Sequence, residues 1–166
     1  MTIDWLLVAC AIAVVASGLA AGVFMAFSDF LMESFRTARP ACGIEAMQMI
    51  NRKVYASLFV SILWGLFAAA PLLIGFAVMR GAGSACGWIV AGAGVYVLGV
   101  MVVTFVFNVP MNKELDVMDD SASETQVYWT STYLPSWTLW NSVRAFATTV
   151  SGIGYLVAVV LLARGG

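Results

Sequence analysis

Four uncharged stretches, each about 20 residues or longer, constrain the fold of this chain more than any other feature. They predict spans at about residues 5–28, 54–79, 87–108 and 144–163, the last of which has Arg144 at its start. The hydrocarbon core of a bilayer offers no hydrogen-bond partner to the backbone, so uncharged segments of this length cross it as helices. The sequence therefore predicts an all-α integral membrane four-helix bundle that forms a single transmembrane domain over residues 1–166.

The composition agrees with a membrane protein and excludes several other classes. The chain is 62% hydrophobic and 10% charged, whereas soluble domains are about 45–50% apolar and about 25% charged. The mean hydropathy of +0.95 excludes a disordered chain. A formal net charge of −1 provides no basic surface for phosphate groups. We therefore expect membrane lipid as a partner and no nucleic acid.

The polar residues concentrate in two long connections, residues 29–53 and 108–143. With four spans, these two connections must lie on the same side of the membrane. The first is predicted to be an extended helical hairpin that Pro40 and Gly43 interrupt. The second is predicted to contain a short loop helix that begins near Ser123.

The distribution of positive charge predicts the orientation. Six lysines and arginines lie on the side of the long connections and two lie on the other side. By the positive-inside rule, the protein is expected to be a multi-pass cell-membrane protein with cytoplasmic long loops and both termini outside. Gly18 and Gly22 form a G-x-x-x-G pair beside a ridge of small residues at four-residue spacing, Ala9, Ala13, Ser17 and Ala21. Packing inside the bundle is the preferred interpretation of this pair, and a homo-oligomer face is the alternative.

The chain contains no histidine, and this absence excludes much of the redox chemistry known in membranes. Bis-histidine haem and histidine-ligated iron, copper and zinc centres all need imidazole ligands. The three cysteines are far apart and form no C-x-x-C pair. We therefore expect no metal and no cofactor.

All four asparagines fall at or near the long-loop end of a predicted span: Asn51, Asn108, Asn112 and Asn141. Arg144 lies three residues after Asn141, on the same helical face. Taken singly, a residue of this type at a helix end is more often a helix cap or an interfacial side chain than part of a site. Amides are costly to bury without partners, however, and the set as a whole favours a polar pocket at the mouth of the bundle.

Aromatic residues accompany these polar groups. Trp137 and Trp140 share the face of Asn141, and Arg52 lies at the same level with Glu45 as a local carboxylate. The apolar floor of the pocket is predicted to come from Phe24, Phe27, Tyr55, Phe105 and Phe107.

Four motifs together resemble the anthrone-oxygenase-like membrane family, much of which is otherwise a domain of unknown function. They are G-x-F-x-A-F at residues 22–27, M-Q-x-I-N at 47–51, N-V-P-x-N-x-x-L at 108–115 and W-x-x-W-N-x-x-R at 137–144. The resemblance extends over about residues 18–150, and its third and fourth motifs are the most specific.

The named activity of that family is the oxidation of an anthrone to an anthraquinone by O₂. The resemblance implies cofactor-independent oxidation of an aromatic, anthrone-type small molecule in the polar pocket. Either Glu45 or a phenol of the substrate is the base. The implied catalytic residues are Asn51, Asn108, Asn112, Asn141 and Arg144, and the implied substrate-binding residues are Arg52, Tyr55, Phe24, Phe27, Trp137 and Trp140.

Two other classes of function stay open. A small-molecule or lipid/quinone-binding membrane protein without chemistry would have the same pocket, and only turnover distinguishes it. A structural protein that assembles through Gly18 and Gly22 would instead tolerate alanine at the asparagines.

Overall fold

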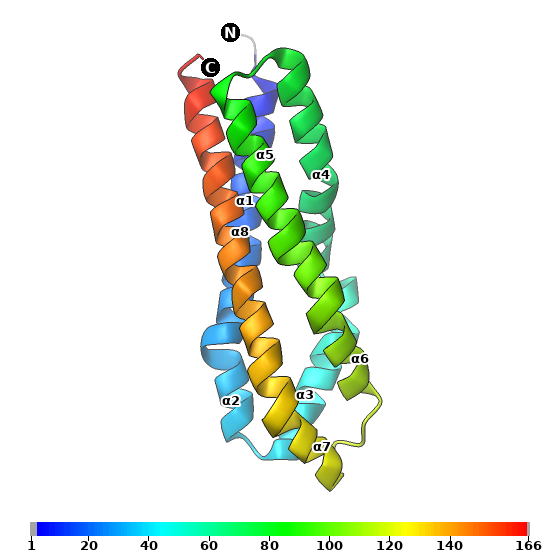
Figure 1. The fold of residues 1–166 in the computed structure, drawn as a ribbon. Coiled ribbons are helices and arrows are strands. Elements are labelled where there is room, and N and C mark those ends of the chain that lie inside the picture. Colours follow the sequence, from blue (N-terminus) through cyan, green and yellow to red (C-terminus); the bar gives the residue numbers. More distant parts are fainter. Residues whose placement is uncertain (1–2, 166) are drawn as a thin grey trace.

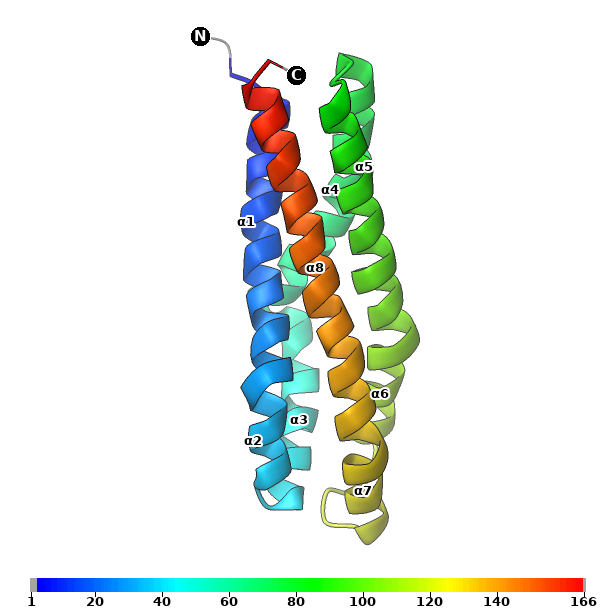
Figure 2. The same ribbon diagram turned by 60° about the vertical axis from the view of Figure 1, so that its left-hand side comes forward.

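The computed structural model describes residues 3–165, which contain no β-strand and form an elongated bundle of four long helical segments (Figures 1 and 2). Each segment is long and apolar enough to cross a membrane. The all-α membrane bundle is therefore confirmed. The four segments are Trp5–Thr37, Leu58–Arg80, Ser84–Asp116 and Ser123–Ala163.

The first two segments are joined by a helical hairpin. Segment one consists of α1 (Trp5–Ala26), the π-helical turn η1 (Phe27–Leu31) and α2 (Met32–Thr37). The chain then returns through α3 (Pro40–Lys53), the 3₁₀ turn η2 (Val54–Ala56) and α4 (Leu58–Arg80).

The last two segments are also longer than the bilayer core requires. Segment three consists of α5 (Ser84–Tyr96), the π-helical turns η3 (Val97–Val102) and η4 (Thr104–Asn108), and α6 (Val109–Asp116). Segment four consists of α7 (Ser123–Tyr128), the π-helical turn η5 (Trp129–Tyr133) and α8 (Leu134–Ala163). The predicted short helix exists as α7, but it continues through η5 into α8 instead of standing apart.

Both long connections lie at the same end of the bundle. The α2–α3 and α6–α7 connections are at one end, and both described termini lie with the α4–α5 turn at the other (Figure 1). This arrangement is the one that four spans predict. Which end faces the cytoplasm stays a prediction.

Two local expectations need correction. Gly43 does not interrupt the hairpin, because it lies inside α3, where an added Cβ would be 2.7 Å from the carbonyl oxygen of Phe35 in α2. It therefore allows the two helices to approach closely. The second span was expected to begin at residue 54, but Ser57 has an extended backbone and α4 begins at Leu58. The Ser57 hydroxyl accepts the Val60 N–H at 3.3 Å and caps α4.

Close packing centres on α8. An added Cβ at Gly154 would be 3.1 Å from the Cα of Gly92 in α5, so the two backbones touch. At Gly18 and Gly22 an added Cβ would meet no atom within 4 Å. The two glycines therefore lie off the internal packing face, whereas Ser17 of the same small-residue ridge is buried against Gly152 in α8. A homo-oligomer face at the two glycines stays a prediction.

Candidate functional site

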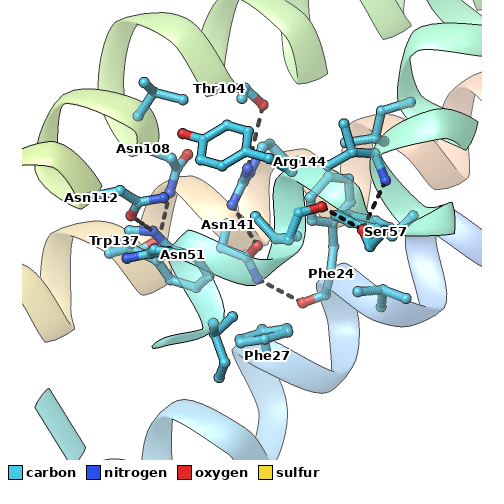
Figure 3. Close-up of a pocket in the computed structure, with 18 of the residues that line it drawn as sticks. Phe24, Phe27, Asn51, Ser57, Thr104, Asn108, Asn112, Trp137, Asn141 and Arg144 are labelled. Carbon is cyan, nitrogen blue, oxygen red and sulfur yellow. Dashed lines mark hydrogen bonds between the residues drawn. The ribbon is translucent and has the colours of Figure 1, made fainter. Parts of the chain in front are cut away.

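A cavity of about 290 Å³ lies beside the break between α3 and α4 (Figure 3). Its wall comes from all four segments and includes the end of α1, the break itself, η4 with the start of α6, and one face of α8. The wall is mostly apolar and aromatic, with a small number of polar groups. This combination is typical of small-molecule sites, and the volume is at the lower end of their range.

Among the described residues, Arg144 is the only cation in the cavity wall, and only 6% of its surface is exposed. Its Nη2 donates to Asn141 Oδ1 at 2.8 Å and its Nη1 donates to Thr104 Oγ1 at 3.3 Å. Its Nε is buried without a hydrogen-bond partner in the described part of the chain. The guanidinium carbon lies 4.6 Å from the centre of the Phe24 ring and 5.4 Å from that of Trp137. Arg144 is thus held by neutral groups alone.

The amide of Asn141 has a fixed orientation. Its Nδ2 donates to the backbone carbonyl of Phe24 at 2.6 Å and to Ser28 Oγ at 2.6 Å. A carbonyl can only accept, so the amide nitrogen must face α1 and the amide oxygen must face Arg144. Asn141 therefore ties α8 to α1 and orients the guanidinium.

A second group of hydrogen bonds links three segments through a buried phenol. Tyr133 OH accepts from Asn51 Nδ2 at 3.4 Å and donates to Asn112 Oδ1 at 2.9 Å. Trp137 Nε1 donates to the same Asn112 oxygen at 2.8 Å. An indole nitrogen is only a donor, so the Asn112 oxygen must face it, and the Asn112 NH₂ remains as a donor.

Asn108 supplies an unused acceptor. Its Nδ2 donates to the backbone carbonyl of Trp137 at 3.3 Å. Its Oδ1 is buried and has no hydrogen-bond partner within residues 3–165. The residue ends the π-helical turn η4, and such turns are frequent at functional sites.

Most of the residues expected in a pocket line this cavity, although their roles stay predictions. The expectation that polar and aromatic side chains converge at the long-loop end agrees with the geometry. The expected residues on the wall are Phe24, Phe27, Asn51, Tyr55, Asn108, Asn112, Trp137, Asn141 and Arg144.

Arg52 and Glu45 do not belong to this cavity. Arg52 is exposed, and its Nε bonds the carboxylate of Asp116 in α6 at 2.6 Å rather than Glu45. This pair joins α3 to α6 in a neighbouring groove, which shares Asn51, Tyr55 and Asn112 with the cavity wall. Glu45 is exposed and absent from the wall, so it cannot serve as a base inside the cavity.

Three predicted aromatic residues lie elsewhere. Trp140 stacks on Phe107, with ring centroids 3.6 Å apart and planes 5° apart, and neither ring lines the cavity. Phe105 lies near Trp64 with ring centroids 6.0 Å apart. All three point away because one helical turn places only one face toward the bundle.

The sequence reasoning missed Tyr133, Thr104 and Ser28. Tyr133 precedes Trp137 by four residues and Asn141 by eight, so the periodicity that selected those residues also selects Tyr133. Thr104 and Ser28 become neighbours of Arg144 and Asn141 only through the packing of separate segments. No local pattern marks them.

The described part of the chain contributes no aspartate, glutamate, histidine or cysteine to the wall. Within residues 3–165, no three such side chains are grouped closely enough to hold a metal ion. The cavity can therefore offer amide and hydroxyl groups, one fixed positive charge and aromatic surfaces.

A family model described as anthrone oxygenase matches residues 47–154, which is more than half of the chain. The matched region includes every asparagine of the cavity wall and Arg144. Neither a curated protein nor a solved structure matches the chain.

Proposed function

We propose, given that this chain belongs to the anthrone oxygenase family, that it oxidises an anthrone-type aromatic substrate with O₂ in the cavity around Arg144. The observation that supports this site is a buried guanidinium held only by neutral groups within an aromatic wall. Such a group stabilises an oxyanion strongly, because little water is present to screen the charge.

The reaction draws its driving force from the substrate. Loss of a proton from the methylene carbon of an anthrone gives an aromatic enolate whose negative charge is largely on oxygen. The enolate transfers one electron to O₂, and the resulting superoxide and carbon radical form a C–O bond. After protonation, this peroxide loses its remaining C–H proton while the O–O bond breaks and hydroxide leaves. The sum is one anthrone and one O₂ giving one anthraquinone and one water.

The side chains of the wall would position and stabilise the charged species. Arg144 faces the enolate oxygen, and the free NH₂ of Asn112 is a further donor. Phe24 and Trp137 provide flat apolar surfaces for the rings. The wall supplies no carboxylate or imidazole base, so the methylene proton passes to a phenolate of the substrate or to water.

That missing base also favours a second candidate function. A protein that binds an aromatic quinone or a lipid without converting it needs the same cavity and no base. Turnover distinguishes the two functions.

The test is oxygen uptake and quinone absorbance with purified protein in detergent, anthrone and a metal chelator. We expect one O₂ per quinone at a rate above the protein-free reaction. Arg144→Gln should lower that rate on the order of 10²-fold, the cost of removing one oxyanion donor. Arg36→Gln is the matched control, because Arg36 is exposed and lies outside the cavity. A rate equal to the protein-free reaction would refute the oxidation and favour binding alone.

A further inference from the structure

Some exposed arginines of this protein have carboxylate partners, whereas the buried Arg144 has none among the described residues. Three arginines form ion pairs with carboxylates within residues 3–165: Arg36 with Glu33, Arg52 with Asp116, and Arg80 with Asp4. All three lie partly or largely in solvent, where a counter-ion contributes least. Arg144, the buried one, forms no ion pair with any described carboxylate.

An unpaired buried charge is costly. Removing the partner of a buried ion typically destabilises a protein by several kcal/mol, and a charged residue within a membrane bundle is a functional feature by default. The amide of Asn141 and the hydroxyl of Thr104 compensate part of this cost but leave the net charge in place. None of the wall residues that the structure describes is acidic, so none cancels this charge.

We infer that the cavity takes its ligand in ionised form, so that the oxyanion of an aromatic enolate or phenolate is the counter-ion of Arg144. This inference rests on the proposed function and names the substrate class of the same site. The ligand releases its proton to water as it binds, and the anion is then ready to react with O₂.

The fixed polar groups agree with an anionic ligand. Asn141 cannot turn its NH₂ toward the ligand, because that nitrogen bonds the Phe24 carbonyl and Ser28. Its oxygen therefore stays on the guanidinium, and the remaining N–H groups of Arg144 are available to an oxyanion. Binding of the ionised form also explains how a wall without a base can support the reaction.

Asn108 adds a second requirement. Asn108 is part of the cavity wall, its nitrogen bonds the Trp137 carbonyl, and its Oδ1 is buried without a hydrogen-bond partner among residues 3–165. An amide oxygen accepts a hydrogen bond and repels an oxyanion. A ligand with its oxyanion at Arg144 and a hydroxyl group that reaches Asn108 would supply the donor that this amide oxygen lacks.

A coloured phenol tests the ionisation directly. The probe is 2-hydroxyanthraquinone, a flat three-ring phenol that does not react with O₂ and changes its visible spectrum on ionisation. The full-length protein in detergent micelles is titrated with acid and base, with empty micelles as the reference. An opposite charge within about 4–6 Å lowers a pKa by about 1–3, and we expect this shift for the bound probe. A proton should also be released when the probe binds below its ordinary pKa.

Three variants assign the effect to the charge. Arg144→Gln should abolish the lowered probe pKa, Arg144→Lys should keep part of it, and Arg36→Gln should match the wild type. If Arg144→Gln does not fold, the probe pKa measured in Arg144→Lys still tests the role of the charge. Asn108→Ala should weaken binding of a dihydroxy probe more than binding of the monohydroxy one.

Several results would overturn the inference. These are a bound probe with the same pKa as in empty micelles, an equal shift in Arg144→Gln, or no binding of the ionised probe. If the bound probe ionises but anthrone is not oxidised, the inference holds and the proposed oxidation is wrong. If anthrone is oxidised while the bound probe stays neutral, only the inference is wrong.

Discussion

Replacing Asn141 by aspartate would give Arg144 the counter-ion that the cavity wall lacks. The new carboxylate retains an oxygen at the position that now lies 2.8 Å from Arg144 Nη2. It also places an oxygen, instead of an N–H, at the position that lies 2.6 Å from the Phe24 carbonyl. The substitution changes the charge of the site from +1 to zero and leaves its shape almost unaltered.

The magnitudes follow from these contacts. The Phe24 carbonyl still accepts the Phe27 N–H, but losing the Asn141 donor and placing two oxygens in contact should cost about 1–3 kcal/mol. The new ion pair offsets this loss, so the protein should fold. The neutralised guanidinium no longer stabilises an oxyanion, which should lower anthrone turnover by about 10²–10³-fold. Asn141→Ala removes three hydrogen bonds, only one of which is made by Arg144, and it keeps the positive charge. It should lower turnover only about tenfold, equivalent to about 1.4 kcal/mol.

The assay is quinone formation under saturating oxygen, with thermal stability measured on the same samples. The decisive comparison is the turnover of Asn141→Asp against that of Asn141→Ala, and we expect the aspartate variant to be slower. If the aspartate variant were as active as the alanine variant or more active, a free positive charge would not be needed, and the reasoning about Arg144 would be refuted.

Three further predictions concern packing, the buried phenol and pH. Gly154→Ala adds a methyl group against a facing backbone and should lower stability by about 1–3 kcal/mol in thermal unfolding, whereas Gly94→Ala meets no atom within 4 Å and should not. Tyr133→Phe removes the hydroxyl that orients two amides, so turnover should fall with little change in folding; equal turnover would contradict this. Arg80 holds the pKa of the Asp4 carboxyl below its usual value. The stability that Asp4 contributes is present above about pH 4 and is lost as the pH falls through the lowered pKa. Asp4→Asn should therefore destabilise the protein near pH 6 and progressively less in acid.

The sequence was sufficient for the fold class because lipid permits few backbone structures. Uncharged segments identified the four spans, and their number placed both long connections at one end. The exact helix limits depended on tertiary contacts instead. Ser57 ends the 3₁₀ turn and caps α4, although the sequence across it is continuously uncharged.

The site was predictable where helical periodicity decides direction. Trp137, Asn141 and Arg144 lie on one face of a single helix, and all three line the cavity. Arg52 was misassigned because its partner, Asp116, comes from a distant segment. Trp140 was misassigned because it directly precedes Asn141, and adjacent residues of a helix point about 100° apart.

A photolabelling experiment would locate the ligand without depending on turnover. Under near-ultraviolet light, 4-hydroxybenzophenone, a two-ring phenolic ketone of similar shape, inserts into nearby C–H bonds, and peptide mass spectrometry identifies the labelled segments. We predict labels on the residues around Phe24, Val60 and Trp137, which line the cavity, and competition by 2-hydroxyanthraquinone. Labels confined to the outer apolar groove lined by Leu7, Ile12 and Leu19, with no competition, would contradict a ligand site at Arg144.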